Sequence, residues 1–478
     1  MRYSARKSKR DNHTREILYI LLLGLCTVFS IWYISAASKD VVWSDYIRII
    51  NEYLPDVKDV SKLLVPDILT RAPLSYLIRL INTEYFGFSV NFDRAFTIVG
   101  LVLTGIVVLH FALKLNVKPH WYILLLIIIF SLGKWEVLLN GTAWPHVVAI
   151  GLFFVNYLIF DRIWTGDSTA WIELAALVMP FALLLIAAEY IASYAVTMII
   201  VSLFGAMTGG AVNVGSKRAQ KVFLRILIST SAALLLYLLS RHFASWEHAG
   251  ATDMTLIEVI KWAPSYLPKF FLKTLAGSII GQETVSKYGI SDIVLYILGA
   301  GVFAAYVLSF ITYIKSGMSE ISVFPVILLI SGAVNHCLIT YARWIFLSED
   351  YALSSRYGVQ FMIGLIGIVF IAAMYKKPEM RYSRRKIHRL DNASRILICI
   401  MCLVMAFGMC LTTADEINKA KYRKENYEKM EEMVLSYKDH TEEELCSVLE
   451  WHKDPAALIS ALDIIKENKL NVFGNPRR

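Results

Sequence analysis

ILYILLLGLCTVFSIWYISAA, residues 17–37, is the stretch that decides the fold of this chain. A helix of about 20 apolar residues spans the hydrocarbon core of a bilayer. Residues 1–16 are rich in arginine and lysine, and Trp32 and Tyr33 lie at the far end of the run. This arrangement predicts a membrane span with a cytoplasmic N-terminus. A cleaved signal peptide is the competing interpretation, because residues 35–37 resemble a cleavage site, but the length of the run favours an uncleaved anchor.

The composition of the whole chain agrees with a membrane protein. Of its 478 residues, 56% are hydrophobic and 13% are aromatic, which is too apolar for a soluble enzyme of this size. The net charge is +9, and the basic residues fall in short runs between apolar segments. Such runs are typical of cytoplasmic loops that meet anionic lipid headgroups. We therefore expect membrane lipids as partners and no nucleic acid.

The cysteines predict neither a disulfide framework nor a metal site. Only Cys446 lies in a polar region, and the other cysteines lie in apolar runs. Cys399 and Cys402 form a C-x-x-C pair, but no histidine is nearby, so a packing role is expected. No cofactor is predicted, and the need for a divalent cation stays open.

Further apolar runs predict an all-α, polytopic membrane protein with about eleven transmembrane helices. Besides residues 17–37, the predicted spans are 96–115, 121–132, 143–160, 171–187, 190–207, 223–239, 293–313, 323–341, 357–375 and 396–413. The loops that this register places inside contain runs of lysine and arginine at 114–118, 217–225 and 376–389, whereas the short loops that it places outside are nearly bare of both. An odd number of spans places the C-terminal tail, residues 414–478, outside.

Two long external loops, 38–95 and 241–292, interrupt the transmembrane domain 17–413. In the first loop, apolar residues recur at helical spacing over 74–81, and in the second Thr255 and Glu258 have the spacing of a capping box. Both patterns predict amphipathic helices that lie along the membrane interface. The alternative is a lid that packs on the helical bundle.

The tail 414–478 is polar and has helical signals of its own. Residues 441–444 form a second capping-box pattern, and Asp454 precedes Pro455 as an N-cap precedes a helix-opening proline. The tail is too short to bury a substantial core alone. We expect it to dock on the external loops or on a partner protein.

The chemistry of the chain is concentrated at the predicted outer ends of the spans. A phosphate-binding glycine loop, an H-E-x-x-H motif and a G-x-S-x-G motif are all missing from the sequence, which argues against common ATP-driven pumps and zinc proteases. Carboxylates can take a proton from a hydroxyl, arginines can clamp a phosphate, and aromatic rings can stack on a sugar. The candidate residues with these properties are Trp43, Asp45, Arg71, Lys134, Glu136, His146, Glu189, Tyr190, Arg356 and Tyr357.

Each of the main candidates also has a structural interpretation. Glu189 lies in a nearly unbroken apolar stretch, where an ionisable group tends to be functional, but a turn that reaches water would make it a loop acid. Arg356 opens a span from the outer side, where the charge bias disfavours arginine, which indicates a functional role. The alternative is an arginine that snorkels to the interface. Asp45 is one of several acids in its loop. His146 is either a ligand-binding or a packed histidine.

The layout resembles the GT-C superfamily of membrane glycosyltransferases, including its bacterial surface-polysaccharide and glucosyltransferase-type members. The resemblance rests on the basic N-terminus, one span, a long first external loop with Trp43-Ser44-Asp45, and Ser355-Arg356-Tyr357 at the outer end of a later span. It implies that Asp45 is the catalytic base or positions the acceptor, and that the donor is a polyprenyl-phosphate-linked sugar. It also makes Arg356 a candidate for binding the donor phosphate. Many relatives have two adjacent acids in the first loop, whereas Tyr46 follows Asp45 here.

These patterns lead to a functional hypothesis. The protein would act in the bacterial plasma membrane, in polysaccharide biosynthesis for the cell envelope, by transferring the sugar to a glycan or lipid acceptor on the outer face. Arg356, with Arg71 or Lys134, would hold the phosphate, and Asp45 would be the base, with Glu189 as the alternative. A transporter or flippase of lipid-linked saccharide is a second hypothesis, which the mostly apolar mid-span positions disfavour. A non-catalytic subunit of a polysaccharide assembly system, working through its tail, is a third.

Overall fold

The computed structural model describes residues 2–64, 73–211, 216–242, 250–374 and 392–474. In these residues every regular element is a helix, as the sequence predicts. Ten helical segments of the described chain are long and apolar enough to cross a membrane. They comprise α1 (Arg2–Ala37), α4 (Val90–Lys114), α5 (Pro119–Phe130) with α6 (Trp135–Leu139), α7 (Trp144–Trp164), α9 (Ile191–Thr208), α10 (Lys217–His242), α14 (Asp292–Ser316), α15 (Phe324–Arg343), α16 (Gly358–Met374) and α17 (Asn392–Leu435).

The protein is therefore an all-helical integral membrane protein, and its spans differ from the predicted ones in detail. The span predicted at 171–187 corresponds to α8 (Ala170–Ile186), an apolar helix of 17 residues that is shorter than the others. The span predicted at 396–413 is part of α17, which continues without a break to Leu435. The predicted basic loop 376–389 and Arg71 lie outside the described residues.

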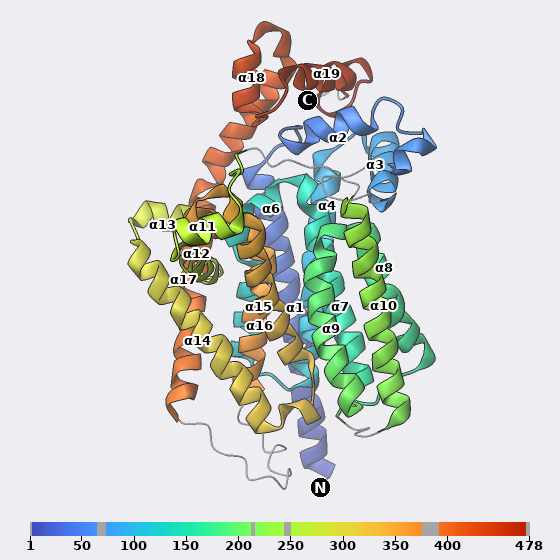
Figure 1. Ribbon diagram of the computed structural model, residues 1–478, viewed down its shortest axis with the longest axis vertical. Helices are drawn as coiled ribbons and strands as arrows, with labels where there is room; N and C mark the ends of the chain where they lie inside the picture. Colours follow the sequence, from blue (N-terminus) through green and yellow to red (C-terminus); the bar gives the residue numbers. More distant parts are fainter. Residues whose placement is uncertain (1, 65–72, 212–215, 243–249, 375–391, 475–478) are drawn as a thin grey trace.

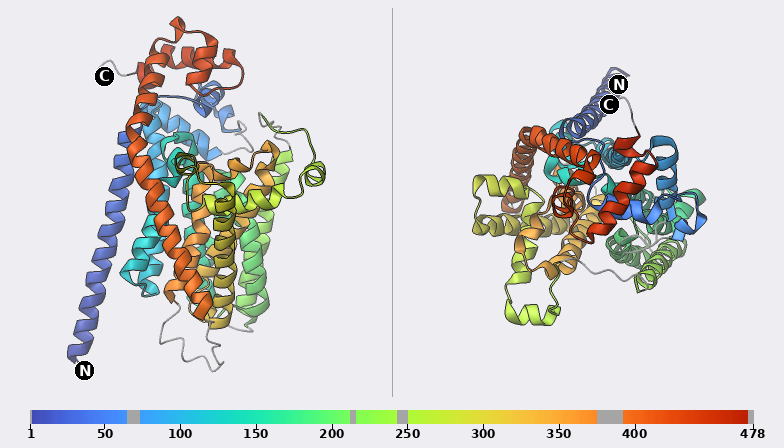
Figure 2. Two further views of the ribbon diagram at one scale, coloured as in Figure 1. Left: turned by 90° about the vertical axis from the view of Figure 1, so that its left-hand side faces the viewer. Right: turned by 90° about the horizontal axis from the view of Figure 1, so that it is seen from above.

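The membrane helices run roughly along one direction, with the N-terminus at one end of the bundle and the tail at the other (Figure 1). We call the tail-bearing end the distal end. It carries α2 (Asp45–Tyr53) and α3 (Pro73–Phe86) of the first loop, and α18 (Glu442–Val448) and α19 (Pro455–Glu467) of the tail. The end of α17 projects past the bundle and carries α18 and α19 over α2 (Figure 2). The second loop adds α11 (Leu256–Trp262), α12 (Tyr266–Gly277) and α13 (Gln282–Tyr288) near the distal ends of the spans.

Local signals in the sequence explain where the short helices begin. The capping box at α11 is confirmed, because Thr255 and Glu258 each bond the backbone of the other. A second confirmed capping box opens α18 in the same way. The Asp454 carboxylate accepts a hydrogen bond from the Ala456 N–H at 3.0 Å, with Pro455 in the first turn of α19. These side chains satisfy N–H groups that a helix start leaves without partners.

Both predicted amphipathic helices have an apolar face that points away from the protein. In α3, the side chains of Leu77, Ile81 and Tyr85 are exposed at successive turns, whereas Arg79 on the opposite face is buried. The α11 helix exposes Ile257, Ile260 and Trp262. The inward faces pack on the protein, so the structure combines features of both interpretations of the external loops.

A buried carboxylate joins three helices at the end of the bundle nearest the N-terminus. Asp161, near the end of α7, accepts hydrogen bonds from the Ser322 hydroxyl at 2.6 Å and the Val323 N–H at 2.8 Å, just before α15. Lys114, at the end of α4, pairs with the same carboxylate at 2.7 Å. The Asp161 side chain has no exposed surface, so its charge loses its hydration on folding. These bonds compensate for that loss.

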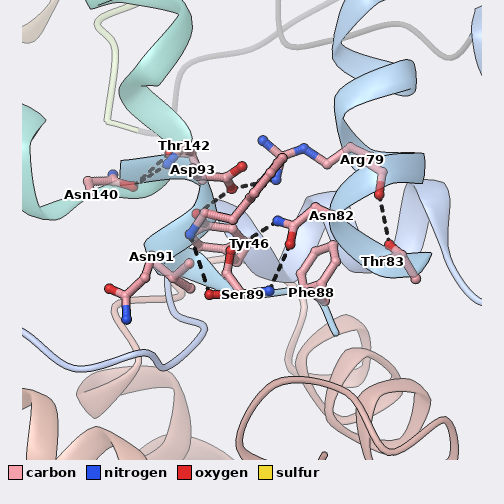
Figure 3. A network of polar contacts seen from close by, with 12 residues as sticks. Tyr46, Arg79, Asn82, Thr83, Phe88, Ser89, Asn91, Asp93, Asn140 and Thr142 are labelled. Carbon is pink, nitrogen blue, oxygen red and sulfur yellow. Dashed lines mark hydrogen bonds and ion pairs between the residues drawn. The ribbon is translucent and has the colours of Figure 1, made fainter. Parts of the chain in front are cut away.

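A second buried carboxylate organises the distal end (Figure 3). Asp93, in the first turn of α4, accepts hydrogen bonds from the Tyr46 hydroxyl at 2.7 Å and from Arg79 at 2.5 Å. The Asp93 and Arg79 side chains are 0% and 4% exposed. We call these three residues the Asp93 network. It ties α2 and α3 of the first loop to the membrane bundle.

The tail ends on the same region. Asp40 accepts hydrogen bonds from the Ser89 hydroxyl at 2.8 Å and the Val90 N–H at 2.6 Å, which caps the start of α4. The Asn471 N–H of the tail donates to the Gly87 carbonyl at 2.7 Å in the connection between α3 and α4. We expect the tail to dock on the external loops or on a partner protein, and the structure shows contact with the first external loop.

Replacement of Asp93 by asparagine should strongly destabilise the protein. The variant leaves the Arg79 charge buried without a carboxylate, a change that costs about 3–5 kcal/mol for a buried ion pair. Thermal unfolding in detergent would measure the loss. Asp167→Asn is the matched control, because Asp167 pairs with Arg162 on the surface at 2.9 Å, and exposed pairs contribute about 0–1 kcal/mol. Equal unfolding midpoints for the two variants would contradict a stabilising role of the Asp93 network.

Candidate functional site

Arg356 is the centre of a group of charged side chains at the distal end. It lies in the short helix η8 (Ser355–Tyr357), directly before α16. Its Nε pairs with the carboxylate of Glu136 in α6, and the Ser355 hydroxyl donates to the same carboxylate at 3.1 Å. The Glu136 side chain is 16% exposed, whereas that of Arg356 is 50% exposed. The guanidinium is therefore anchored by one carboxylate and still reaches solvent.

Asp45 lies close to this pair. It is the first residue of α2 and is half-buried, and its charge acts on the guanidinium of Arg356. The structure thus brings together Asp45, Glu136 and Arg356, which are far apart in the sequence. We call these three residues the acid–arginine site.

A second group of candidates consists of His146, Glu189 and Tyr190. Nδ1 of His146, in the first turn of α7, is 3.1 Å from Oε1 of Glu189 in the short helix η4 (Ala188–Tyr190). The His146 ring centroid is 5.0 Å from that of Tyr190. Tyr357 follows Arg356 in the chain, and the guanidinium of Arg343 lies 5.8 Å from its ring centroid. The Tyr190 ring therefore packs beside the His146–Glu189 pair.

Glu189 is partly exposed and partly enclosed by neighbouring side chains. Its side chain is 30% exposed, so the apolar stretch that contains it reaches the surface at this turn. Its carboxylate lies beside His146, and its charge also acts on the buried Tyr190. Among the described residues, no group of three or more histidine, cysteine, aspartate or glutamate side chains could hold a metal ion.

Lys134 has a different environment from the one expected of a phosphate ligand. Its side chain is 3% exposed, and Nζ donates to the carbonyls of Ile128 at 3.2 Å, Ile129 at 3.0 Å and Ser131 at 3.0 Å. An ammonium has three N–H donors, so these bonds use all of them. Lys134 turns back to satisfy the carbonyls at the end of α5, and we assign it a structural role.

Trp43 is also inside the protein. Its side chain is 6% exposed, and its ring meets that of Tyr427 in α17 edge to face, with centroids 5.8 Å apart. It anchors the first loop to α17 next to Asp45, and it does not offer a ring face to a sugar at the surface. Arg71 lies outside the described residues.

Three further charged residues lie near the candidates and are not among the ten candidate site residues. Arg343 ends α15 and faces Tyr357, and Glu450 follows α18 close to Arg356. Arg423 lies 3.2 Å from the ring centroid of Trp135, the neighbour of Glu136. Of the three, only Arg343 has a signal in the sequence, because it is an arginine near the outer end of a predicted span. Arg423 and Glu450 belong to the tail, whose charges look like an ordinary solvated surface.

Comparison of the chain with protein-family models, with curated proteins and with solved structures gives no match.

The structural role of Lys134 can be tested by its replacement with methionine. Lys134→Met keeps much of the side-chain volume but leaves buried carbonyls without a donor, which should cost about 1–3 kcal/mol. Thermal unfolding in detergent would show a lower midpoint. Lys118→Met is the control, because Lys118 is exposed at the other end of α5. A midpoint for Lys134→Met as high as that of the control would argue against the capping role.

Proposed function

We propose that the protein transfers a sugar from a polyprenyl-phosphate donor to a glycan or lipid acceptor at the outer face of the membrane. The observation that carries this proposal is the acid–arginine site, in which an anchored, half-exposed arginine lies beside carboxylates at one end of a membrane bundle. A lipid-phosphate substrate needs a cation at the membrane surface, and an acceptor hydroxyl needs a base.

Arg356 would hold the phosphate of the donor. A guanidinium has five N–H donors, and Glu136 contacts Arg356 through Nε. The contact fixes the orientation of the guanidinium plane, which prepares it for two parallel bonds to phosphate oxygens. As the sugar leaves, negative charge grows on the phosphate, so the arginine stabilises the transition state more than the bound donor.

Asp45 would be the base in the transfer step. The acceptor hydroxyl oxygen forms a bond to the anomeric carbon, the bond from that carbon to the phosphate oxygen breaks, and the hydroxyl proton goes to the Asp45 carboxylate. The polyprenyl phosphate leaves with the electron pair. Tyr46 follows Asp45 in the chain, and its buried hydrogen bond to Asp93 holds the start of α2 in place. This bond would position Asp45. The His146–Glu189 pair is the alternative base.

The apolar faces of α3 and α11 support a substrate that comes from the membrane. Their exposed leucine, isoleucine, tyrosine and tryptophan side chains lie at the distal ends of the spans, where interfacial helices bury such residues among lipid headgroups. We place both helices on the outer membrane surface. The acid–arginine site would then lie at the level where a lipid phosphate meets water.

The orientation in the membrane can be measured with an impermeant maleimide. In a cysteine-free background, Glu443→Cys on the tail should be labelled in intact cells, because the basic N-terminus predicts that the distal end is outside. Lys118→Cys, at the opposite end of α5, should be labelled only after permeabilisation. The reverse pattern would place the acid–arginine site in the cytoplasm and would contradict transfer at the outer face.

Transfer itself can be tested with site variants in purified protein, with polyprenyl-phosphate glucose as the first donor probe. Asp45→Asn should slow transfer about 10²–10⁴-fold, the usual contribution of a general base. Arg356→Gln should also slow transfer and should weaken donor binding. Asp59→Asn, in the same loop but on the surface, and Arg162→Gln, in an exposed ion pair, are the matched controls and should act like the unmodified protein.

Alanine variants and a deletion in cells separate the enzyme from the two rival functions. Deletion of the protein should change the surface glycan, and Asp45→Ala should reproduce that change. If Asp45→Ala and Glu189→Ala both left the glycan unaltered while the deletion altered it, the proposed enzyme would be excluded. A flippase or a non-catalytic subunit would then be the better explanation.

A further inference from the structure

The tail reaches the acid–arginine site through the turn 449–454, which joins α18 to α19. The Ser44 N–H, directly before Asp45, donates to the Leu449 carbonyl at 2.8 Å. Further along α2, the Asn51 side chain donates to the Ala457 carbonyl at 2.7 Å. These two bonds fix the turn against the helix that carries Asp45, and neither of them uses a charged side chain.

The turn has a defined shape of its own. Trp451 is buried, its N–H donates to the Cys446 carbonyl at 2.9 Å, and its indole N–H donates to the Asp454 carbonyl at 2.9 Å. Glu450 has a φ of +52°, in the left-handed region that residues other than glycine rarely adopt. This left-handed residue directly follows the C-cap of α18, and the Trp451 N–H that follows it bonds back to the Cys446 carbonyl, as in a common helix C-cap.

Two charged side chains of the turn lie near charges of the site, because Glu450 directly follows Leu449, whose carbonyl accepts the Ser44 N–H beside Asp45. Glu450 is close enough to Glu136 and Arg356 for both charges to act on it, and Lys453 is acted on by Asp45. Burial and the Glu136 carboxylate raise the pKa of Glu450, and Arg356 opposes this shift. Glu450 therefore adds a further carboxylate to the surroundings of Arg356.

We infer that the turn 449–454 forms the acceptor side of the site, and that Glu450 positions the acceptor by binding one of its hydroxyl groups. This inference rests on the proposed function and names a saccharide, with several hydroxyls, as the acceptor. A carboxylate beside another carboxylate repels a phosphate, so Glu450 is unsuited to the donor phosphate. Carboxylate oxygens accept hydrogen bonds from hydroxyls. Because the hydrogen bonds from Ser44 and Asn51 already dock this part of the tail, the Glu450 charge is not needed to hold the tail in place.

Glu450→Gln separates this role from a structural one, because two measurements should move in opposite directions. The variant removes a negative charge near Arg356, so polyprenyl phosphate without a sugar should bind several-fold more tightly in nanodiscs. In the transfer assay, the apparent KM for a saccharide acceptor should rise about tenfold, the effect of one lost charged hydrogen bond, with a smaller change in kcat. Damage to the fold would weaken both steps. Glu443→Gln, on the exposed start of α18, is the matched control.

Glu450→Asp keeps the charge and should restore most of the acceptor affinity. The inference is overturned if Glu450→Gln and Glu443→Gln give the same acceptor KM and the same phosphate affinity. It is also overturned if Glu450→Gln speeds transfer, because the turn would then be a barrier to the acceptor. If the unmodified protein binds no polyprenyl phosphate and transfers no sugar, the proposed function itself fails, and the inference fails with it.

Discussion

The buried ion pair between Arg79 and Asp93 is the interaction on which the distal end depends. Two charges with almost no contact with water must keep their mutual bonds, because neither can be hydrated in place. Tyr46 shares the Asp93 carboxylate, so the position of α2 follows from the pair. Gly141 lies against the same network: a Cβ atom there would overlap the Tyr46 hydroxyl, so only glycine allows this close approach. The connection from α6 to α7 is thereby held beside α2, which brings the α6 carboxylate of Glu136 toward the start of α2.

Local patterns predicted most of the secondary structure, and long-range contacts account for what they missed. Apolar run length marked the membrane helices, and the capping boxes marked the starts of α11 and α18, because these signals depend on neighbouring residues alone. Arg356 and Glu136 stood out as charges at span ends. Lys134 had the same signal, but its side chain folds back onto α5, and the direction of a side chain is not visible in the sequence. Glu450 was missed because its neighbours Arg356 and Glu136 are 94 and 314 residues away in the sequence.

Polar groups inside the membrane bundle bear on the choice between an enzyme and a transporter. Asn156 of α7 donates to the Tyr194 hydroxyl of α9 at 2.7 Å, and Ser193 of α9 donates to Asn335 of α15 at 2.8 Å. These side chains are neutral and buried, and they bond to each other across helix interfaces. Such pairs stabilise helix packing in membranes, whereas a path for a charged substrate would need ionisable groups near the midplane. The interior is therefore more polar than the sequence indicated, and these two neutral pairs serve helix packing.

The ionisable residues proposed to act on substrate lie at the distal end, and they come from four separate segments: the start of α2, α6, η8 and the turn 449–454. No segment holds a complete site, so the site forms only when the first loop and the tail are both docked on the bundle. The Ser44–Leu449 bond connects these two parts next to Asp45. A change that displaces the tail must then also disturb the helix start that carries the base. The tail and the start of α2 are thus joined structurally, although residues 414–478 have the composition of a separate surface domain.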